Sequence, residues 1–371
     1  MAGTSKFEHG LVVGKFYPPH RGHVHLVESA LAGCHRVTVQ VLYSSVESLP
    51  GVSRAKWLAD CFPATAGLRV LAGLDDVPID YESSAIWDAH EKIMVDLLCA
   101  ADATHPWPRV DAVFSSESYG QEMARRFAAT AVGVDPKRSI HPVSGTAVRS
   151  DLFAHWRSLP APVRAGLCRR VVVVGAESTG TTTLSVDLHR ALVERGGPWA
   201  NTRWVAEYGR EYSADLQARQ RAQKLSHLPS DFPWNELDFR EICRVQLALE
   251  EEAAREGSPV LVCDTDGLAT CLWQERYMGS ISPWVRDFAA ALSPRALYLL
   301  TSHEGVAFED DGLRDQPHLR PGMTQRFREV LAAGNVPWFE LSGSPVQRLQ
   351  RALDILDQDI ESAFRFADPL G

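Results

Sequence analysis

The first half of the chain is organised around the stretch Gly14-Lys15-Phe16-Tyr17-Pro18-Pro19-His20-Arg21-Gly22-His23. It overlaps the apolar run Leu11–Phe16, which predicts a short strand, and Val24, Val27 and Leu31 then recur at helical spacing. A strand, a tight turn and a helix N-terminus in this order bring backbone N–H groups and the helix dipole to one point, which favours an anion. Both imidazoles at the turn can face one phosphate chain. The stretch therefore predicts a site for phosphate chemistry.

A second stretch of this kind, Gly175-Ala176-Glu177-Ser178-Thr179-Gly180-Thr181-Thr182, follows the apolar run Val171–Val174 and precedes a helical pattern over Leu184–Glu194. It has the spacing of a P-loop, G-x-x-x-x-G-K-[ST], except that Thr181 stands where Lys belongs. The backbone nest does not need that Lys, but the phosphate cation must come from elsewhere or is absent. The residues expected to bind ATP here are Gly175, Ser178, Thr179, Gly180, Thr181, Thr182 and Thr183, with Thr182 at the Mg²⁺-ligand position.

Composition limits the classes of protein that fit. A chain of 371 residues with 45% apolar residues can form two domains with ordinary cores. The net charge of −9 disfavours a nucleic-acid partner. No apolar run is long enough for a membrane span, no signal peptide is recognisable, and the seven cysteines contain no CxxC pair, so we expect a cytoplasmic protein with reduced thiols. Homo-oligomerisation is left open.

Both halves read as α/β structure with mostly parallel strands. Further strands are expected at Arg36–Tyr43, Ala112–Ser115, Val260–Cys263 and Leu297–Leu300, each followed by polar or helical sequence. The segment His155–Arg169 contains Pro160 and Pro162 without a clear period, which suggests a linker. We therefore expect a Rossmann-like domain over residues 1–160 and a P-loop domain over residues 161–371.

A further motif of the first half is Val143-Ser144-Gly145-Thr146-Ala147-Val148-Arg149, of the form [IV]SxTxxR, which opens a helix. Ser144 and Thr146 can donate to phosphate, and Arg149 offers a planar guanidinium that stays charged. The alternative for His20 and His23, two ordinary turn histidines, does not explain this second motif.

Together these motifs resemble the HxGH/ISxTxxR nucleotidyltransferases, specifically the nicotinamide-mononucleotide adenylyltransferase branch. The segments Ser84–His90, with its Ile-Trp pair, and Phe114–Gly120 are similar to further elements of that branch. The resemblance implies His20, His23 and Arg149 on the ATP phosphates and Trp87 stacked on the nicotinamide ring, as a cationic pyridinium would favour. The other interpretation of Trp87 is a core tryptophan. The remaining ATP contacts expected in this half are Gly14, Lys15, Phe16, Ser144 and Thr146.

Three features of the second half point to a nucleotide kinase. Asp264-Thr265-Asp266 ends a strand, as in a Walker B motif, where a carboxylate can hold Mg²⁺. Trp204-Val205-Ala206-Glu207-Tyr208-Gly209-Arg210-Glu211-Tyr212 reads as a strand end followed by an acid and a base. The polar stretch from Glu309 through Arg314 to Arg320 has the composition of a lid that carries arginines.

As a set, the two halves resemble the NadR-type bifunctional family, an adenylyltransferase followed by a ribosylnicotinamide kinase. The resemblance implies ATP, nicotinamide mononucleotide, ribosylnicotinamide and NAD as small-molecule partners and Mg²⁺ with ATP. Glu207 or Asp264 would be the kinase base and Asp264 a metal ligand. Further substrate contacts are expected from Tyr208, Arg210 and Asp266, and further ATP contacts from Arg314 and Arg320.

Only about ten residues precede the first strand, so the helix-turn-helix domain of some members is not expected. Two alternatives remain: a second domain that only binds or senses ATP or NAD, and adenylyl transfer to another phosphorylated acceptor.

Overall fold

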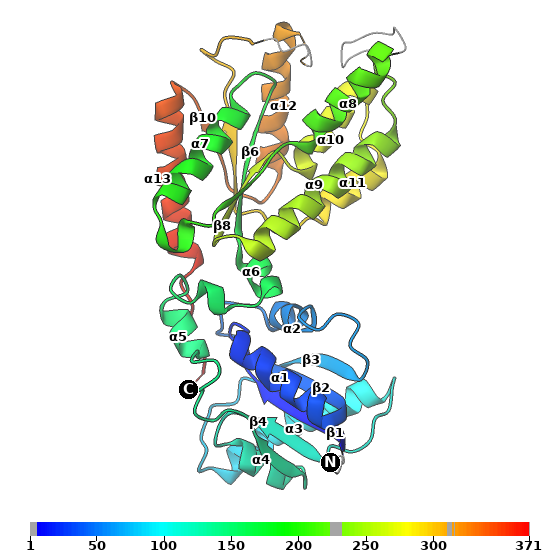
Figure 1. Ribbon diagram of the computed structural model, residues 1–371, viewed down its shortest axis with the longest axis vertical. Coiled ribbons are helices and arrows are strands. Elements are labelled where there is room, and N and C mark those ends of the chain that lie inside the picture. The colour runs from blue at the N-terminus through cyan, green and yellow to red at the C-terminus, as the bar shows by residue number, and fades with distance from the viewer. Residues whose placement is uncertain (1–5, 223–231, 310–313, 315, 371) are drawn as a thin grey trace. The chain divides into compact units, whose positions relative to one another are not determined.

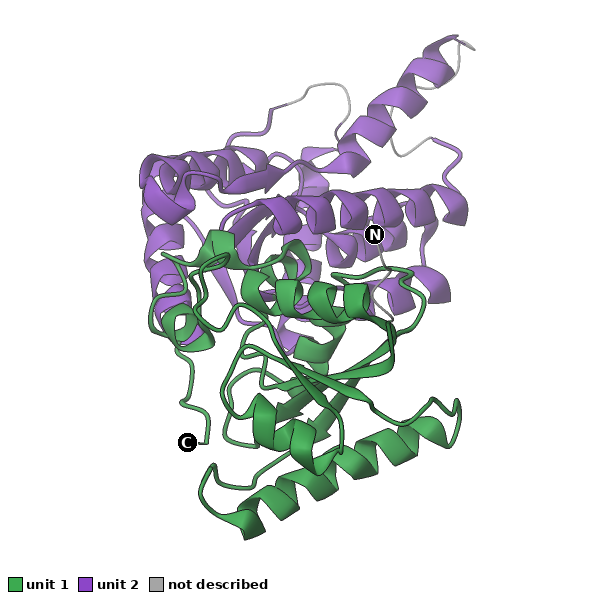
Figure 2. Ribbon diagram, turned by 60° about the horizontal axis from the view of Figure 1, so that its bottom comes forward, with its two compact units in different colours: residues 1–166, 364–371 green, residues 167–363 purple. Residues whose placement is uncertain are grey.

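The computed structural model describes residues 6–222, 232–309, 314 and 316–370. The chain forms two compact units, Met1–Gly166 with Phe364–Gly371, and Leu167–Ala363 (Figure 2). The boundary between the two units, Gly166 to Leu167, falls inside the stretch expected to be a linker. This stretch also contains α6 (Ala161–Leu167), which follows the fully buried Leu159 and includes the fully buried Val163. Pro160 and Pro162 lie at the start of this helix, where a missing backbone N–H is tolerated. The prolines that suggested a linker therefore begin a packed helix.

The first unit is built on a five-stranded, all-parallel sheet in the order β3-β2-β1-β4-β5. Along β1, Val12 packs with one apolar cluster and Leu11 and Val13 with another, so the central strand is buried on both faces. The chain order reverses between β1 and β4, and ligands of such sheets bind at the carboxyl ends of the strands beside that reversal. The strands are β1 (Phe7–Gly14), β2 (Cys34–Tyr43), β3 (Leu68–Leu74), β4 (Ala112–Ser115) and β5 (Thr130–Gly133).

Helices cover both faces of this sheet (Figure 1). Leu26 and Val27 of α1 join the cluster that contains Val12, whereas Trp87 and Met94 of α3 join the opposite cluster. The remaining helices of the unit are short and connect strands or flank the site. The helices are α1 (Arg21–Gly33), α2 (Gly51–Ala59), α3 (Ser84–Asp102), α4 (Gly120–Arg126), α5 (Gly145–Ser150) and most of α6.

The second unit is also built on a five-stranded, all-parallel sheet, with the strand order β10-β9-β6-β8-β7. The valines of β6, the central strand, are nearly inaccessible. The strands are β6 (Arg169–Gly175), β7 (Arg203–Val205), β8 (Val260–Asp264), β9 (Leu297–Thr301) and β10 (Trp338–Leu341). The helices are α7 (Thr181–Glu194), α8 (Tyr208–Ala222), α9 (Glu236–Glu256), α10 (Gly267–Met278), α11 (Pro283–Ala290), α12 (Arg320–Ala333) and α13 (Pro345–Ala363).

The expected class, two α/β units with parallel sheets, is confirmed. None of the helices in the described part of the chain is long and apolar enough to cross a membrane.

Candidate active sites

The first candidate site lies at the carboxyl end of β1, where the chain turns into α1. His20 is the N-cap of α1, and its ring stacks on that of His23 with centroids 3.6 Å apart and planes at 21°. The backbone N–H of His20 donates to His23 Nδ1 over 3.2 Å. The Phe16 ring meets the His23 ring edge-on at 4.8 Å. The turn therefore holds two imidazoles side by side at a helix N-terminus.

Burial determines the charge of this pair. It lowers the pKa of His20 to about 3, with a smaller contribution from the nearby charge of Arg138. Burial also lowers the pKa of His23 well below its ordinary value, assisted by His20 and Arg138. Both rings are thus neutral at neutral pH, and each keeps one N–H. Each ring can therefore donate one hydrogen bond without carrying a charge.

Lys15 and Arg149 bring positive charge to the same place. Lys15 Nζ lies 3.8 Å from Glu47 Oε1, and burial lowers the pKa of this lysine. Arg149 Nη1 donates to the carbonyl of Tyr17 over 2.9 Å, and its Nη2 lies 3.3 Å from Thr146 Oγ1. The guanidinium of the [IV]SxTxxR segment is thereby fixed against the GKFYPPHRGH turn.

These side chains meet at a cavity of about 740 Å³. Every residue that the sequence assigned to adenylyl transfer lines it: Gly14, Lys15, Phe16, His20, His23, Trp87, Ser144, Thr146 and Arg149. Sequence reasoning did not single out several other lining residues, among them Tyr81, Asp135, Arg138, His141, Pro369 and Leu370. Pro369 and Leu370 carry no motif and come from the far end of the chain, so only the fold reveals them.

Trp87 is a core residue that also borders the cavity. It lines the cavity, yet only 8% of the residue is exposed, and it packs with the core cluster of β1 and α3. Its indole N–H donates to the carbonyl of Tyr81 over 3.2 Å, and the Arg126 guanidinium lies 5.6 Å from its ring. One edge of the ring system is thus structural while part of it borders the cavity.

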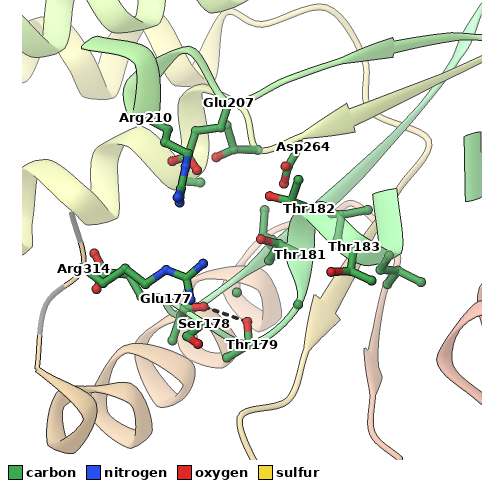
Figure 3. A pocket seen from close by; sticks show the side chains of 18 of the residues that line it. Glu177, Ser178, Thr179, Thr181, Thr182, Thr183, Glu207, Arg210, Asp264 and Arg314 are labelled. Atoms are coloured by element: carbon green, nitrogen blue, oxygen red, sulfur yellow. Dashed lines mark hydrogen bonds between the residues drawn. The ribbon is translucent and has the colours of Figure 1, made fainter. Parts of the chain in front are cut away.

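The second candidate site is the turn between β6 and α7 (Figure 3). Gly180 caps α7 with φ +87°, and Ser178 also has a positive φ of 56°. A side chain at Gly175 would lie 2.2 Å from Thr301 Oγ1 and 2.6 Å from Thr179 Oγ1, so only glycine fits at this close approach. The backbone has the nest conformation that binds phosphate even though Thr181 has replaced the lysine.

Two buried arginines hold the nest through its carbonyl groups. Arg348 of α13 donates to Thr179 O over 2.7 Å, and Arg320 donates to Ser178 O over 3.1 Å. Arg320, which the sequence assigned to ATP, also binds Val306 O and does not line the cavity. Arg320 is the first residue of α12, and its guanidinium binds the backbone carbonyls of Ser178 and Val306. Sequence reasoning missed Arg348, which carries no motif.

The hydroxyl of Thr179 is also internal to the loop. It donates to Ala176 O over 2.7 Å and lies 2.6 Å from Thr301 Oγ1, and the residue is only 1% exposed. Thr179 thus shapes the loop and offers only its backbone to a ligand.

The opposite wall of this cavity, which measures about 650 Å³, is acidic. Burial, reinforced by the charge of Asp264, raises the pKa of Glu207 to about 8. Burial raises the pKa of Asp264 to about 6, and hydrogen bonds from the hydroxyls of Thr182 and Thr181 oppose this shift. Two carboxylates at the ends of neighbouring strands therefore face the phosphate nest (Figure 3).

Arg210 lines the cavity beside Glu207, and Arg314 lines it on the side of Glu177 and Ser178 (Figure 3). Arg314 Nη1 donates to Glu309 O over 2.5 Å. Of the expected lid, residues 310–313 and 315 lie outside the described residues. The structure thus brings Arg210 and Arg314, but not Arg320, to the cavity wall.

An aromatic wall, which sequence reasoning missed, completes the cavity. Trp234 stacks on Tyr277 with centroids 5.3 Å apart, and Trp273 stacks on the same ring at 6.2 Å. Phe239 and Phe327 line the cavity as well. Flat rings in a cavity that also contains Glu207 and Asp264 suit a flat cationic group.

Tyr208 and Asp266, both expected at the substrate, do not line the cavity. Asp266 is fully buried and caps α10 by accepting the N–H of Leu268 over 2.9 Å. It also accepts from Arg295 Nε over 3.0 Å and from the Tyr298 hydroxyl over 2.7 Å. The second carboxylate of the DTD segment is therefore a structural anchor.

A magnesium ion is compatible with the residues present. Thr182 and Asp264 supply a hydroxyl and a carboxylate oxygen at one point, and Mg²⁺ with ATP typically uses few protein oxygens together with water and phosphate. Within the described ranges no cluster of three or more His, Cys, Asp or Glu side chains could hold a metal alone. The donor set thus fits a metal that arrives with a nucleotide.

Comparison with known proteins finds similarity in sequence and in fold. The chain is 26% identical over 295 residues to the trifunctional NAD biosynthesis/regulator protein NadR of Escherichia coli (strain K12). It is 25% identical over 290 residues to the NadR protein of Salmonella typhimurium (strain LT2). The chain is a homologue of NadR. Both matches cover 75% of this chain and 65% of the relative's length, which is less than two thirds of each relative.

Other comparisons concern the fold of this NadR homologue. Residues 170–348 match the family described as an AAA domain. A crystal structure of a NadR protein in complex with NR superposes with a TM-score of 0.64 at 18% identity, over 95% of this chain and 96% of that one. Another, in complex with NAD and AMP-PNP, gives 0.62 at 19% identity, over 96% and 98%. NadR proteins thus share both α/β units.

We expect Trp87→Ala to lower the free energy of unfolding of the first unit of this NadR homologue by about 3–5 kcal/mol, because a large buried ring is lost. Trp87→Phe should lower it by only about 1–2 kcal/mol, because the packing largely remains and one hydrogen bond to Tyr81 O is removed. Urea unfolding followed by circular dichroism measures both. Equal losses would contradict the packing role.

Asp266→Ala should lower the free energy of unfolding of the second unit by about 3–5 kcal/mol, because it leaves Arg295 buried with a lost partner and uncaps α10. The exposed Glu252→Ala on α9 is the matched control and should change stability by less than about 0.5 kcal/mol. Thermal and urea unfolding measure both variants. A loss below about 1 kcal/mol for Asp266→Ala would refute its anchoring role.

Proposed function

We propose that this chain is a bifunctional enzyme of NAD biosynthesis and salvage. The first unit transfers the adenylyl group of ATP to nicotinamide mononucleotide, which gives NAD and pyrophosphate. The observation that carries this assignment is the buried pair His20–His23 at the N-terminus of α1, on one cavity with Lys15 and Arg149. Homology to NadR, and the fold shared with a NadR protein in complex with NAD and AMP-PNP, support it.

Adenylyl transfer is a direct displacement at phosphorus. A phosphate oxygen of the mononucleotide attacks the α-phosphorus of ATP, the bond from that phosphorus to the bridging oxygen breaks, and pyrophosphate leaves with the electron pair. The imidazole N–H groups of His20 and His23, the first N–H groups of α1 and the Arg149 guanidinium stabilise the charge that builds up on the leaving group. Positioning and charge stabilisation suffice, so no covalent intermediate is needed.

The second unit phosphorylates ribosylnicotinamide and so supplies the mononucleotide. The 5′-hydroxyl oxygen attacks the γ-phosphorus of ATP, its proton passes to Glu207, and ADP leaves. Glu207 suits this role because its raised pKa of about 8 lies near neutral pH, where a general base is most effective. Thr182 and Asp264 would hold Mg²⁺, which supplies neutralisation of phosphate charge. Trp234 and Tyr277 supply flat faces for the cationic pyridinium ring.

The replacement of lysine by Thr181 is offset by arginines. Arg210 and Arg314 line the cavity and can bind phosphate oxygens bidentately. Arg320 and Arg348 act through the loop backbone, because their guanidinium groups bind the carbonyls of Ser178 and Thr179 and leave the N–H groups of the loop for the ligand.

His23→Ala should lower the kcat of NAD formation by about 100-fold or more, because one donor to the developing charge is lost. The exposed His35→Ala is the matched control and should retain wild-type kcat. NAD is measured by chromatography from nicotinamide mononucleotide and Mg-ATP, with circular dichroism to verify folding. A folded His23→Ala protein with half the wild-type kcat would contradict the assignment.

Arg314→Ala and Arg210→Ala should each lower γ-phosphoryl transfer to ribosylnicotinamide by about 100-fold, because each removes a cation from the phosphate site. Adenylyl transfer should be unchanged in both. The matched control, exposed Arg351→Ala on α13, should keep both activities. The assay follows ³²P from γ-labelled ATP.

The arginine assay also decides between the kinase and the sensor. Full activity of both variants would refute the substitute-cation role even for an active kinase. A wild-type chain that transfers no γ-label above the rate without enzyme would favour the alternative, a second unit that only binds ATP or NAD. The observation that favours this alternative is Thr181 at the position of the P-loop lysine.

A further inference from the structure

The last segment of the chain docks beside the adenylyl transfer site. Residues 364–371 directly follow α13 but belong to the first unit (Figure 2). The Tyr17 hydroxyl donates to Ala367 O over 3.0 Å, and the Ala367 N–H donates to Ser48 Oγ over 2.7 Å. Lys15 Nζ donates to Leu370 O over 2.5 Å. Two of these three bonds come from the GKFYPPHRGH turn itself.

Aromatic contacts anchor the same segment. Phe366 meets Tyr17 edge-on with centroids 6.0 Å apart, and Phe364 meets Phe153 edge-on at 5.4 Å. Beyond these anchors Pro369 and Leu370 line the cavity. The segment, which we call the C-terminal strap (residues 364–370), is therefore docked at several points and forms part of the cavity wall.

Lys15 has a competing partner on its other side. Glu47 Oε2 accepts from Arg54 Nη2 over 2.6 Å, and both side chains are fully buried. Within the described part of the chain, Glu47 Oε1 is buried without a hydrogen bond, and it lies 3.8 Å from Lys15 Nζ. A buried carboxylate oxygen attracts an ammonium strongly, so Lys15 would close this gap if nothing held it away.

We propose that the strap is a positioning element of the adenylyl transfer site: the Leu370 carbonyl holds Lys15 Nζ away from Glu47 and keeps its charge directed at the triphosphate. This inference rests on the proposed adenylyl transfer. A carbonyl is a neutral acceptor that occupies one of the three N–H groups of the ammonium and leaves two for phosphate oxygens. A close ion pair with Glu47 would instead neutralise the charge and turn the side chain away.

Removal of residues 364–371 from the otherwise full chain should raise the KM for ATP in NAD formation by roughly tenfold, the effect of losing one charge-assisted phosphate contact. The kcat should change less. Phosphorylation of ribosylnicotinamide, measured on the same sample, should keep its KM for ATP, because the second unit is untouched.

Glu47→Gln in the shortened chain should return the KM for ATP most of the way to the wild-type value, because an amide cannot form the competing ion pair. Glu47→Gln in the full chain is the remaining variant of this double-mutant cycle and gives the effect of the substitution when the strap is present.

A second variant undocks the strap without shortening it. Phe366→Ala with Ser48→Ala removes one aromatic anchor and one hydrogen bond and should raise the same KM. The matched control is Asp368→Ala, an exposed side chain within the strap, which should leave the KM unchanged.

Each other result contradicts the proposal. An unchanged KM in both the shortened and the undocked chain would make the strap merely structural. A lower KM would identify it as an obstruction to ATP. A raised KM that Glu47→Gln does not restore would refute the competition for Lys15. A full chain that forms no NAD would refute the proposed function itself.

Discussion

In both units the helix that follows the central strand begins at the carboxyl edge of a parallel sheet, where its first N–H groups have no partner within the helix. Those groups and the helix dipole require an anion or a capping side chain. Both candidate sites are built outward from this constraint. In the first unit His20 caps α1 and stacks on His23. In the second, Gly180 caps α7 without a side chain and leaves the N–H groups of the loop to a ligand.

The two sites supply positive charge in different ways. The first pairs neutral, buried imidazoles with Lys15 and Arg149, so each ring can donate a hydrogen bond without the desolvation penalty of a buried charge. The second has no lysine in its loop. Arg320 and Arg348 bind the carbonyls of the loop, and Arg348 lines the cavity together with Arg210 and Arg314. The backbone geometry of the nest thus depends on residues far away in the sequence.

How far the sequence predicts the molecule depends on the range of each interaction. Central strands such as β1 and β6 are apolar on both faces and are recognisable alone, as are the glycine and histidine turns that follow them. The edge strands β3, β5 and β10 were not expected. They are partly exposed, and β5 and β10 have only four residues each. Arg320 and Asp266 were expected at ligands because the sequence gives the residue type but not the direction of the side chain.

Contacts between distant segments could not be read from motifs. Several contacts join parts of the chain that share no sequence pattern. They are the bond from Arg348 to the loop, the aromatic wall at Tyr277 and the bond from Lys15 to the strap. Local spacing thus predicts where an anion binds, whereas the tertiary fold decides which side chains surround it.

The central claim is that one chain carries two different phosphorus transfers at two separate sheet edges. The most direct measurement incubates the full chain with ribosylnicotinamide and Mg-ATP labelled with ³²P at the γ-position and ³³P at the α-position, and isolates the NAD. The account predicts NAD that carries both labels, since the γ-phosphoryl group becomes the phosphate of the mononucleotide and the α-phosphoryl group enters with the adenylyl half. Absence of the γ-label, or NAD formed only when the mononucleotide is supplied, would contradict it.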